Sequence, residues 1–297
     1  MGKHLVVGAG QVGSHLARTL AGQGHEVVQV SRSGSGPYGV AADASDRARL
    51  TELAKGADAV YNCVNPAYHR WLTDWPPMAE SFLAAAREND SVLVILGNLY
   101  VYGPVDGPMT DDLPLRPSSE KAAVRAKIWN DALASGVRTV EVRGSDYFGP
   151  GSTDQGYFGE ERFLKPLRER KTIRTVWPLD VPHTFTYLPD VAESLAIAGS
   201  DPRAWGRAWH VPSNEPTTFR EMGSRMAAVL GLPEPRMSAM PWPMVRMAGL
   251  FSPMVGEMKH VRYQFTSPFV MESADFTTTF GLRATPMDEA LRRTLGR

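Results

Sequence analysis

The stretch Gly8-Ala9-Gly10-Gln11-Val12-Gly13 decides the fold, because it joins a short apolar run at 5–7 to a helical pattern at 12–22. Each glycine has a separate task in such a turn. Gly8 permits a tight bend, Gly10 lets the backbone approach a pyrophosphate, and Gly13 lets helix and strand pack closely. The unpaired N–H groups and the dipole at the helix start favour an anion. The motif therefore predicts a dinucleotide-binding loop, with a plain strand–helix turn as the alternative.

Short β-rich runs alternate with helical patterns along the first two thirds of the chain. The run at 91–96 is apolar nearly throughout, which is typical of a strand covered on both faces of a parallel sheet. A helix at 71–88 is expected to break or start late near Pro76 and Pro77. Further strands are expected at 26–30, 40–42, 57–64, 138–142 and 208–211, and further helices at 44–55, 118–135, 160–170, 190–198, 219–230 and 287–295. The alternation predicts an α/β protein with a Rossmann-type, doubly wound parallel sheet.

The regular alternation of strands and helices ends after residues 149–151, where helices and loops rich in Pro and Met follow. We expect a cofactor-binding domain of residues 1–148 and 181–211. A smaller, mostly helical substrate lobe is expected from residues 149–180 and 212–297. The length of 297 residues agrees with about two domains or one large α/β unit.

Composition limits the classes of function. Lys plus Arg (32) equals Asp plus Glu (32), and this zero formal charge argues against a nucleic-acid partner or an anionic membrane surface. The single cysteine, Cys63, forms no internal disulfide and no zinc cluster, which fits a cytoplasmic protein without a metal. The sequence contains no uninterrupted run of 18 apolar residues, so we expect no membrane-spanning helix.

The end of the second predicted strand indicates which dinucleotide is bound. An acidic residue there would bind a ribose 2′-hydroxyl, but the chain reads Ser31-Arg32-Ser33. A guanidinium suits a 2′-phosphate, so we expect NADP, with NAD as the alternative. After the third strand, Asp43 either accepts a hydrogen bond from adenine or caps a helix.

Several stretches resemble the extended short-chain dehydrogenase/reductase superfamily, the NAD(P)-dependent epimerase/dehydratase group. They are the glycine loop, residues 43–46, Val101-Tyr102-Gly103, residues 143–151, residues 187–192, and Phe280-Gly281-Leu282 with Thr285-Pro286. Their order spans nearly the whole chain, although GxGxxG in place of the group's usual GxxGxxG points to an atypical branch. The glycine loop and the resemblance together give this expected cofactor site: Gly8, Gly10, Gln11, Val12, Gly13, Ser31, Arg32, Ser33, Asp43, Ala44, Cys63, Val64, Asn65, Lys121, Arg143, Ser145 and Tyr147.

The catalytic set of such enzymes is degenerate in this chain. The resemblance implies a tyrosine four residues before a lysine, with a serine or threonine to orient the carbonyl. Lys121 best matches the lysine, but the tyrosine position holds Pro117, or Ser118 if one residue has been lost, and the hydroxyl position holds Asn98. We therefore expect Lys121, Asn98 and Tyr102 to carry catalytic roles. Tyr100, Tyr147 and His183 are further candidates for the proton donor, each with plain packing or a loop position as its alternative.

Three functions stay open from the sequence. One is an NADP-dependent oxidoreductase or epimerase with a non-standard proton donor. The second is a redox sensor that binds NADP without turnover, and the third is a non-redox lyase or cyclase on the same fold.

The Met-rich stretch 235–271 is either lobe core, a dimer surface, or an apolar substrate cleft. In the cleft reading, Trp242, Met244, Met247, Phe251 and Met254 contact a small, fairly apolar substrate. The resemblance also implies a homodimer through the helices near 77–88 and 118–135.

Overall fold

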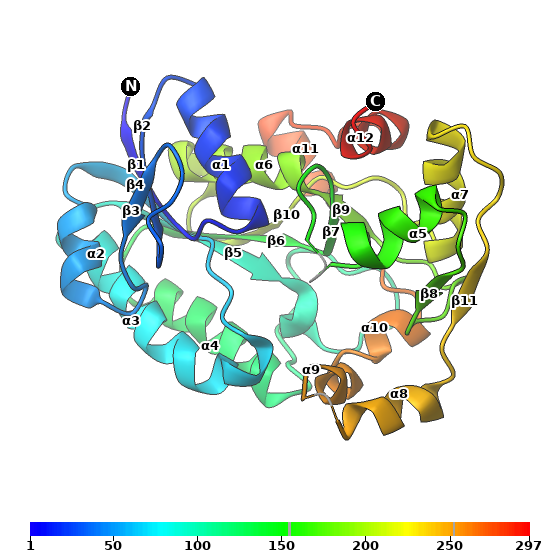
Figure 1. Cartoon of the computed structure of the whole chain (residues 1–297). Helices are drawn as coiled ribbons and strands as arrows, with labels where there is room; N and C mark the ends of the chain where they lie inside the picture. Colours follow the sequence, from blue (N-terminus) through cyan, green and yellow to red (C-terminus); the bar gives the residue numbers. More distant parts are fainter. Residues whose placement is uncertain (154–155, 252) are drawn as a thin grey trace.

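A computed structural model describes residues 1–153, 156–251 and 253–297. Seven parallel strands form the main sheet in the order β10-β6-β5-β4-β1-β2-β3 (Figure 1). Because β1 has β2 on one side and β4 on the other, the strand order reverses here, as in a Rossmann fold. The expected fold class is confirmed. The strands are β1 Lys3–Val7, β2 Glu26–Ser31, β3 Gly39–Ala41, β4 Ala57–Asn62, β5 Val92–Asn98, β6 Thr139–Gly144 and β10 Ala208–His210.

Helices cover both faces of this sheet (Figure 1). Helices α1 (Gln11–Gly22), α6 (Leu188–Ser200) and α11 (Ala274–Phe280) pack on one face against side chains such as Val94. Helices α2 (Arg47–Leu53), α3 (Trp71–Glu88) and α4 (Glu120–Ala134) pack on the other face against side chains such as Ile95. Because both faces are buried, the strands consist of continuous apolar runs.

The expected break near Pro76 and Pro77 is wrong, since α3 runs without interruption from Trp71. The two prolines remove only the amide donors that would reach the carbonyls of Leu72 and Thr73. These residues lie in the exposed first turn, where carbonyl groups can bond to water. Trp71 and Trp75 are buried on the core side of the same turns, so their packing holds the helix together.

Helix α2 starts at Arg47, three residues later than expected. The Asp46 carboxylate accepts a hydrogen bond from the backbone N of Arg49 at 3.0 Å and so caps the helix. The capping alternative therefore applies to Asp46, while Asp43 stays outside the helix.

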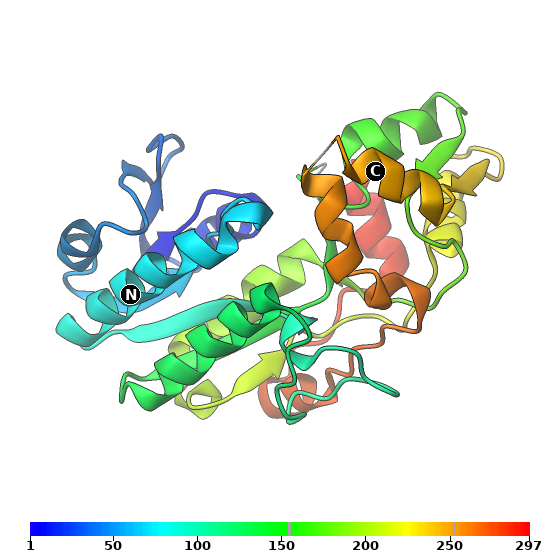
Figure 2. The same ribbon diagram turned by 90° about the horizontal axis from the view of Figure 1, so that it is seen from below.

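The remaining elements gather beside the sheet, as Figure 2 shows. Two short parallel pairs, β7 with β9 and β8 with β11, were not expected because three residues are too few for a strand pattern. The elements beside the sheet, including these four strands, are β7 Asp146–Phe148, η3 Glu160–Leu164, α5 Lys165–Arg168, β8 Ile173–Thr175, β9 Phe185–Tyr187, α7 Phe219–Val229, β11 Met237–Ala239, α8 Trp242–Gly249, α9 Pro253–Gly256, η5 Glu257–His260, α10 Tyr263–Thr266 and α12 Met287–Thr294. The short helices η1 Tyr68–Arg70, η2 Leu99–Tyr102 and η4 Pro202–Ala204 complete the structure.

An aromatic core holds this part together, with Phe158, Trp177 and Phe265 among its buried side chains. Helix α11 lies in the range expected for the lobe but packs on the sheet. Throughout the described part of the chain, every helix is too short or too polar to cross a bilayer.

Main-chain segments from β1, α1 and β4 approach one another most closely at two glycines. Gly8 has φ +121°, and a Cβ there would lie 2.5 Å from the carbonyl oxygen of Cys63. A Cβ on Gly13 would overlap the carbonyl oxygen of Gly8. Both positions therefore exclude any side chain, which fixes how α1 leaves the sheet.

The variant Gly13→Ala is expected to lower the free energy of unfolding by about 1–3 kcal/mol, because the added methyl meets rigid backbone. The matched control is Gly22→Ala in the last turn of the same helix, where a Cβ meets nothing within 4 Å. It is expected to be neutral or to stabilise by up to about 1 kcal/mol. Urea unfolding followed by circular dichroism measures both variants, and equal effects would contradict the close approach.

Candidate functional site

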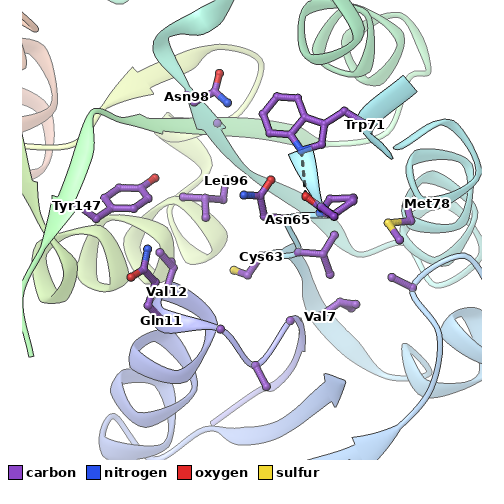
Figure 3. A pocket seen from close by; sticks show the side chains of 18 of the residues that line it. Val7, Gln11, Val12, Cys63, Asn65, Trp71, Met78, Leu96, Asn98 and Tyr147 are labelled. Carbon is purple, nitrogen blue, oxygen red and sulfur yellow. Dashed lines mark hydrogen bonds between the residues drawn. The ribbon is translucent and has the colours of Figure 1, made fainter. Parts of the chain in front are cut away.

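A cavity of about 1020 Å³ lies at the carboxyl ends of the central strands. Its wall includes the last residues of three strands, Val7 of β1, Ser31 of β2 and Asn98 of β5, and also Cys63, which directly follows β4. Figure 3 shows Val7, Cys63 and Asn98, from three of these segments, around it. Ligands of doubly wound sheets bind at this edge, next to the point where the strand order reverses. The fold therefore places one large site where a Rossmann protein binds its cofactor.

The start of α1 faces this cavity. Gly10, Gln11 and Val12 line it, and a Cβ on Gly10 would meet nothing within 4 Å. Gly10 is thus not needed for internal packing, in contrast to Gly8 and Gly13, and its bare backbone leaves room for a ligand. Amide groups in the first turn of a helix have no intrahelical acceptor and attract anions. This geometry fits the pyrophosphate of a dinucleotide.

Another part of the cavity wall is formed by residues at the end of β2 and after β3. Ser31, Arg32 and Ser33 line it, and the Arg32 side chain is exposed. Asp43 and Ala44 also line it. The Asp43 carboxylate accepts hydrogen bonds from the hydroxyl and the backbone N of Ser45, at 2.6 and 2.8 Å, and these lower the pKa of Asp43.

Cys63, Val64 and Asn65 follow β4 and line the cavity. Figure 3 labels Cys63 and Asn65 in this part of the wall. The Cys63 side chain is buried, and burial raises the pKa of its thiol to about 12. The thiol therefore stays protonated at neutral pH and is a poor nucleophile.

The ends of β5 and β6 bring Asn98, Tyr100, Ser145 and Tyr147 to the cavity. The Asn98 Oδ1 accepts a hydrogen bond from the backbone N of Tyr100 at 3.2 Å, so this amide holds a loop while it also faces the cavity. Burial raises the pKa of the Tyr100 and Tyr147 hydroxyls above the ordinary value. Both phenols therefore stay neutral and are weak acids.

Tyr102 and Arg143 belong to a buried network outside the cavity. The Tyr102 hydroxyl lies 2.8 Å from Nε2 of His210 and accepts a hydrogen bond from Nη1 of Arg143 at 2.7 Å. Arg143 also donates from Nε to Glu141 at 2.7 Å. Burial lowers the pKa of His210 to about 3, so its ring is neutral and accepts the hydroxyl proton. Tyr102 and Arg143 therefore bond to other buried side chains, and neither lines the cavity.

The Lys121 side chain is also bonded to another residue of the protein. Its ammonium group pairs with the Glu257 carboxylate from η5 and lies 4.1 Å from the centre of the Tyr68 ring. The side chain is almost fully buried, and Lys121 does not belong to the cavity wall. Pro117 and Ser118 precede α4, so the structure supplies no tyrosine partner from that segment.

Arg125, one turn further along α4, does line the cavity. Its Nη2 donates to the carbonyl of Leu96, and its guanidinium lies 4.4 Å from the centre of the Trp75 ring. The Nε atom has no hydrogen-bond partner among the described residues. Burial lowers the pKa of this group, though an arginine still remains charged.

The side chains expected to form an apolar cleft lie elsewhere. Trp242 stacks on Trp177 with ring centres 6.4 Å apart, and neither lines the cavity. Met244, Met247 and Phe251 are 51%, 59% and 87% exposed. The Met254 side chain lies outside those that the structure describes. The cavity instead receives Gln264 and Phe269 from this part of the chain.

Sequence reasoning missed Asp146, Arg125, Gln264 and Phe269 as cavity residues. Asp146 could have been predicted, because it is an acid two residues after β6, a strand that ends at the ligand-binding edge. The others depend on tertiary packing. Within the described residues, no group of three or more His, Cys, Asp or Glu side chains is arranged to hold a metal ion.

The variant Tyr102→Phe is expected to lower the free energy of unfolding by about 1–3 kcal/mol, because Arg143 and His210 lose their shared partner. The control Tyr38→Phe removes a hydroxyl that makes no hydrogen bond with the described residues and should change little. Chemical unfolding compares the two. Unchanged stability with loss of turnover would show instead that the Tyr102 hydroxyl reaches a substrate.

Solved structures similar to this chain share its fold along nearly their whole length. The enzyme WbmH of Bordetella bronchiseptica, in complex with NAD+, is 20% identical with a TM-score of 0.74, and the match covers 100% of this chain and 98% of that one. The dTDP-glucose 4,6-dehydratase of Bacillus anthracis, in complex with NAD, is 14% identical with a TM-score of 0.80, covering 100% and 96%.

The UDP-glucuronic acid 4-epimerase of Bacillus cereus, in complex with NAD, is 16% identical with a TM-score of 0.75, covering 98% and 96%. A search of curated proteins gave no match. The model of the NAD dependent epimerase/dehydratase family matches residues 4–210, which is more than half of the chain. The protein therefore belongs to the NAD dependent epimerase/dehydratase family.

Proposed function

We propose that this protein binds NADP in the cavity and acts as an oxidoreductase or epimerase on a carbonyl or alcohol substrate. The observation that carries the proposal is the start of α1, where Gly10 presents bare backbone to the cavity. The family match supports it, and so do the solved relatives whose structures contain NAD. A bound nicotinamide would take or supply the hydride, and the protein would orient the substrate and move the proton.

The preference for NADP over NAD rests on the end of β2. Arg32 lies there among Ser31, Ser33 and Ser35, and all four line the cavity. A planar guanidinium binds a phosphate through two parallel hydrogen bonds, and the hydroxyls add donors. The nearest carboxylate, Asp43, already accepts two hydrogen bonds from Ser45. These groups favour a 2′-phosphate over a 2′-hydroxyl.

For the substrate we propose a small and fairly apolar molecule. Three solved relatives are named for nucleotide sugars or contain one. A diphosphate of that kind needs cations on the substrate side of the site. From residues 212–297, the described part of the cavity wall contains Gln264 and Phe269 and no Lys or Arg. This composition favours an uncharged substrate.

A second candidate is NADP binding without turnover, as in a redox sensor. It is favoured by the pairing of Lys121 with Glu257 and by Pro117 at the position of the catalytic tyrosine. Mixing the protein with NADPH and a carbonyl panel separates the two functions. Oxidation of NADPH supports an enzyme, and binding without oxidation supports the sensor.

We further propose a cytoplasmic homodimer that uses α3 and α4. The two helices pack side by side on one face of the sheet, as that assembly requires. The single protonated thiol of Cys63 agrees with a reducing compartment.

The variant Gly10→Ala is expected to weaken the binding of both NADPH and NADH by at least about tenfold, because the new methyl enters the space for the pyrophosphate. Its unfolding free energy should stay near that of the wild type, since the Cβ meets no protein atom within 4 Å. Fluorescence titration measures binding. Wild-type affinity in this variant would contradict the proposed site.

The variant Arg32→Ala is expected to weaken NADPH binding roughly 10- to 150-fold, the value of a charge-assisted hydrogen bond, and to leave NADH nearly unchanged. The control is Arg47→Ala, which removes an exposed arginine paired with Glu88 outside the cavity wall. Equal losses for the two cofactors in Arg32→Ala would show that Arg32 does not recognise the 2′-phosphate.

A further inference from the structure

Asp146 places a carboxylate at the edge of the sheet where the catalytic set is incomplete. It begins β7 two residues after Gly144, and Gly144 lies beside Asn98 in the parallel register of β5 and β6. Its side chain is 21% exposed, and Asp146 and Asn98 both line the cavity. Asp146 therefore contributes to the cavity wall only two residues along the chain from the register partner of Asn98.

His183 lies directly behind this carboxylate. Its side chain is 1% exposed, and its Nε2 is 2.7 Å from Oδ2 of Asp146. The ring stacks on Phe265 with centres 5.0 Å apart and an interplanar angle of 5°. Backbone hydrogen bonds in both directions with Thr217, at 2.8 and 3.0 Å, fix its main chain. The imidazole is thus held in one orientation, with one ring nitrogen toward the cavity carboxylate.

The hydrogen bonds around His183 indicate where its protons are. Nδ1 lies 3.2 Å from the carbonyl oxygen of Gln264, which can only accept, so Nδ1 carries a proton. Nε2 faces the carboxylate of Asp146 at 2.7 Å, and that contact also needs a proton, on either the nitrogen or the oxygen. The Ser145 hydroxyl, 3.5 Å from Nε2, completes the group. The pair therefore shares one proton beyond the one on Nδ1.

The other ionisable groups of the cavity are less suited to this work. Asp43 is held by Ser45, and Asp74 accepts two hydrogen bonds from Arg70 at 3.0 and 3.1 Å. Burial, together with the negative charge of Asp146, raises the pKa of Tyr100 and Tyr147 on the cavity wall, and also that of Tyr157 outside it. Arg125 is the nearby cation that acts on Tyr147. Asp146 differs from Asp43 and Asp74 because its hydrogen-bond partner, the imidazole of His183, can itself hold or release a proton.

We propose that Asp146 is the catalytic acid–base group of this protein, with His183 as the residue that positions it and shares its proton. This inference rests on the proposed function. In alcohol oxidation, the substrate O–H bond breaks and its proton passes to Asp146. The electron pair of that bond forms the C=O double bond, and the hydride of the C–H bond passes to the oxidised nicotinamide. Carbonyl reduction is the reverse, with the reduced nicotinamide as hydride source and Asp146 returning the proton to oxygen.

Nuclear magnetic resonance tests the shared proton without a substrate. Ring ¹⁵N and carboxyl ¹³C shifts of His183 and Asp146 are measured at pH 7 in the wild type, with Asp146→Asn and His183→Gln for assignment. Either imidazolium with carboxylate, or imidazole with carboxylic acid, is the expected state. A neutral imidazole beside an ionised carboxylate would overturn the proposal.

Kinetics test the catalytic role. The wild type is mixed with NADPH and a panel of aliphatic and aromatic aldehydes and ketones, with UDP-glucose as a polar member. For a carbonyl that is reduced, Asp146→Asn is expected to lower kcat by about 10²- to 10⁴-fold and to leave the Kd of NADPH within about twofold. His183→Gln is expected to shift the pH profile of kcat, which a purely structural role would not move.

The controls are Asp106→Asn and His69→Gln, which change an exposed carboxylate and an exposed imidazole outside the cavity wall. Wild-type kcat in a folded Asp146→Asn variant overturns the proposal. If that variant does not fold, the NMR measurement on the wild type decides. Binding of NADPH without any turnover overturns the acid–base role and supports the sensor, whereas failure to bind NADPH overturns the proposed function itself.

Discussion

The rest of the structure depends on the close approach of three main-chain segments where β1, α1 and β4 meet. Gly8 and Gly13 have no room for a Cβ because carbonyl groups of Cys63 and Gly8 occupy that space. This contact sets the direction of α1, and so turns its first amide groups toward the carboxyl ends of the strands. A Cβ on Gly10 would meet no atom within 4 Å, so the fold does not require a glycine there as it does at Gly8 and Gly13.

The polar side chains near this edge fall into two groups according to their partners. Arg143, Glu141, Tyr102 and His210 satisfy one another in the buried interior, and Lys121 is paired with Glu257. Breaking such pairs leaves an uncompensated buried group, so they are committed to stability. Asp146 instead keeps a partly exposed carboxylate on the cavity wall. The chemistry available to the site is thus decided by which groups the fold leaves open.

Most of the sheet could be predicted from the sequence, because each central strand is a buried apolar run and each intervening helix has its own pattern. The positions of the glycine loop and Arg32 beside the cavity could be predicted for the same reason, because they follow from which residues come directly after β1 and β2. The local sequence pattern gave a wrong prediction of a helix break at Pro76 and Pro77, where buried tryptophans keep α3 continuous. It also failed for the pair of Lys121 with Glu257, which are 136 residues apart. The pairing of Asp146 with His183 depends in the same way on tertiary contacts that no spacing reveals.

The state of Cys63 limits how this protein can respond to oxidants. The chain has no second cysteine with which to close a disulfide, and the one thiol is buried and protonated. Peroxides and disulfide reagents react with thiolates, which are scarce here at neutral pH. Oxidation of Cys63 is therefore a poor way for this protein to sense oxidants. A nicotinamide bound at the glycine loop, as proposed above, would give the protein a route to the redox state of its surroundings that does not use Cys63, through the ratio of the reduced to the oxidised cofactor.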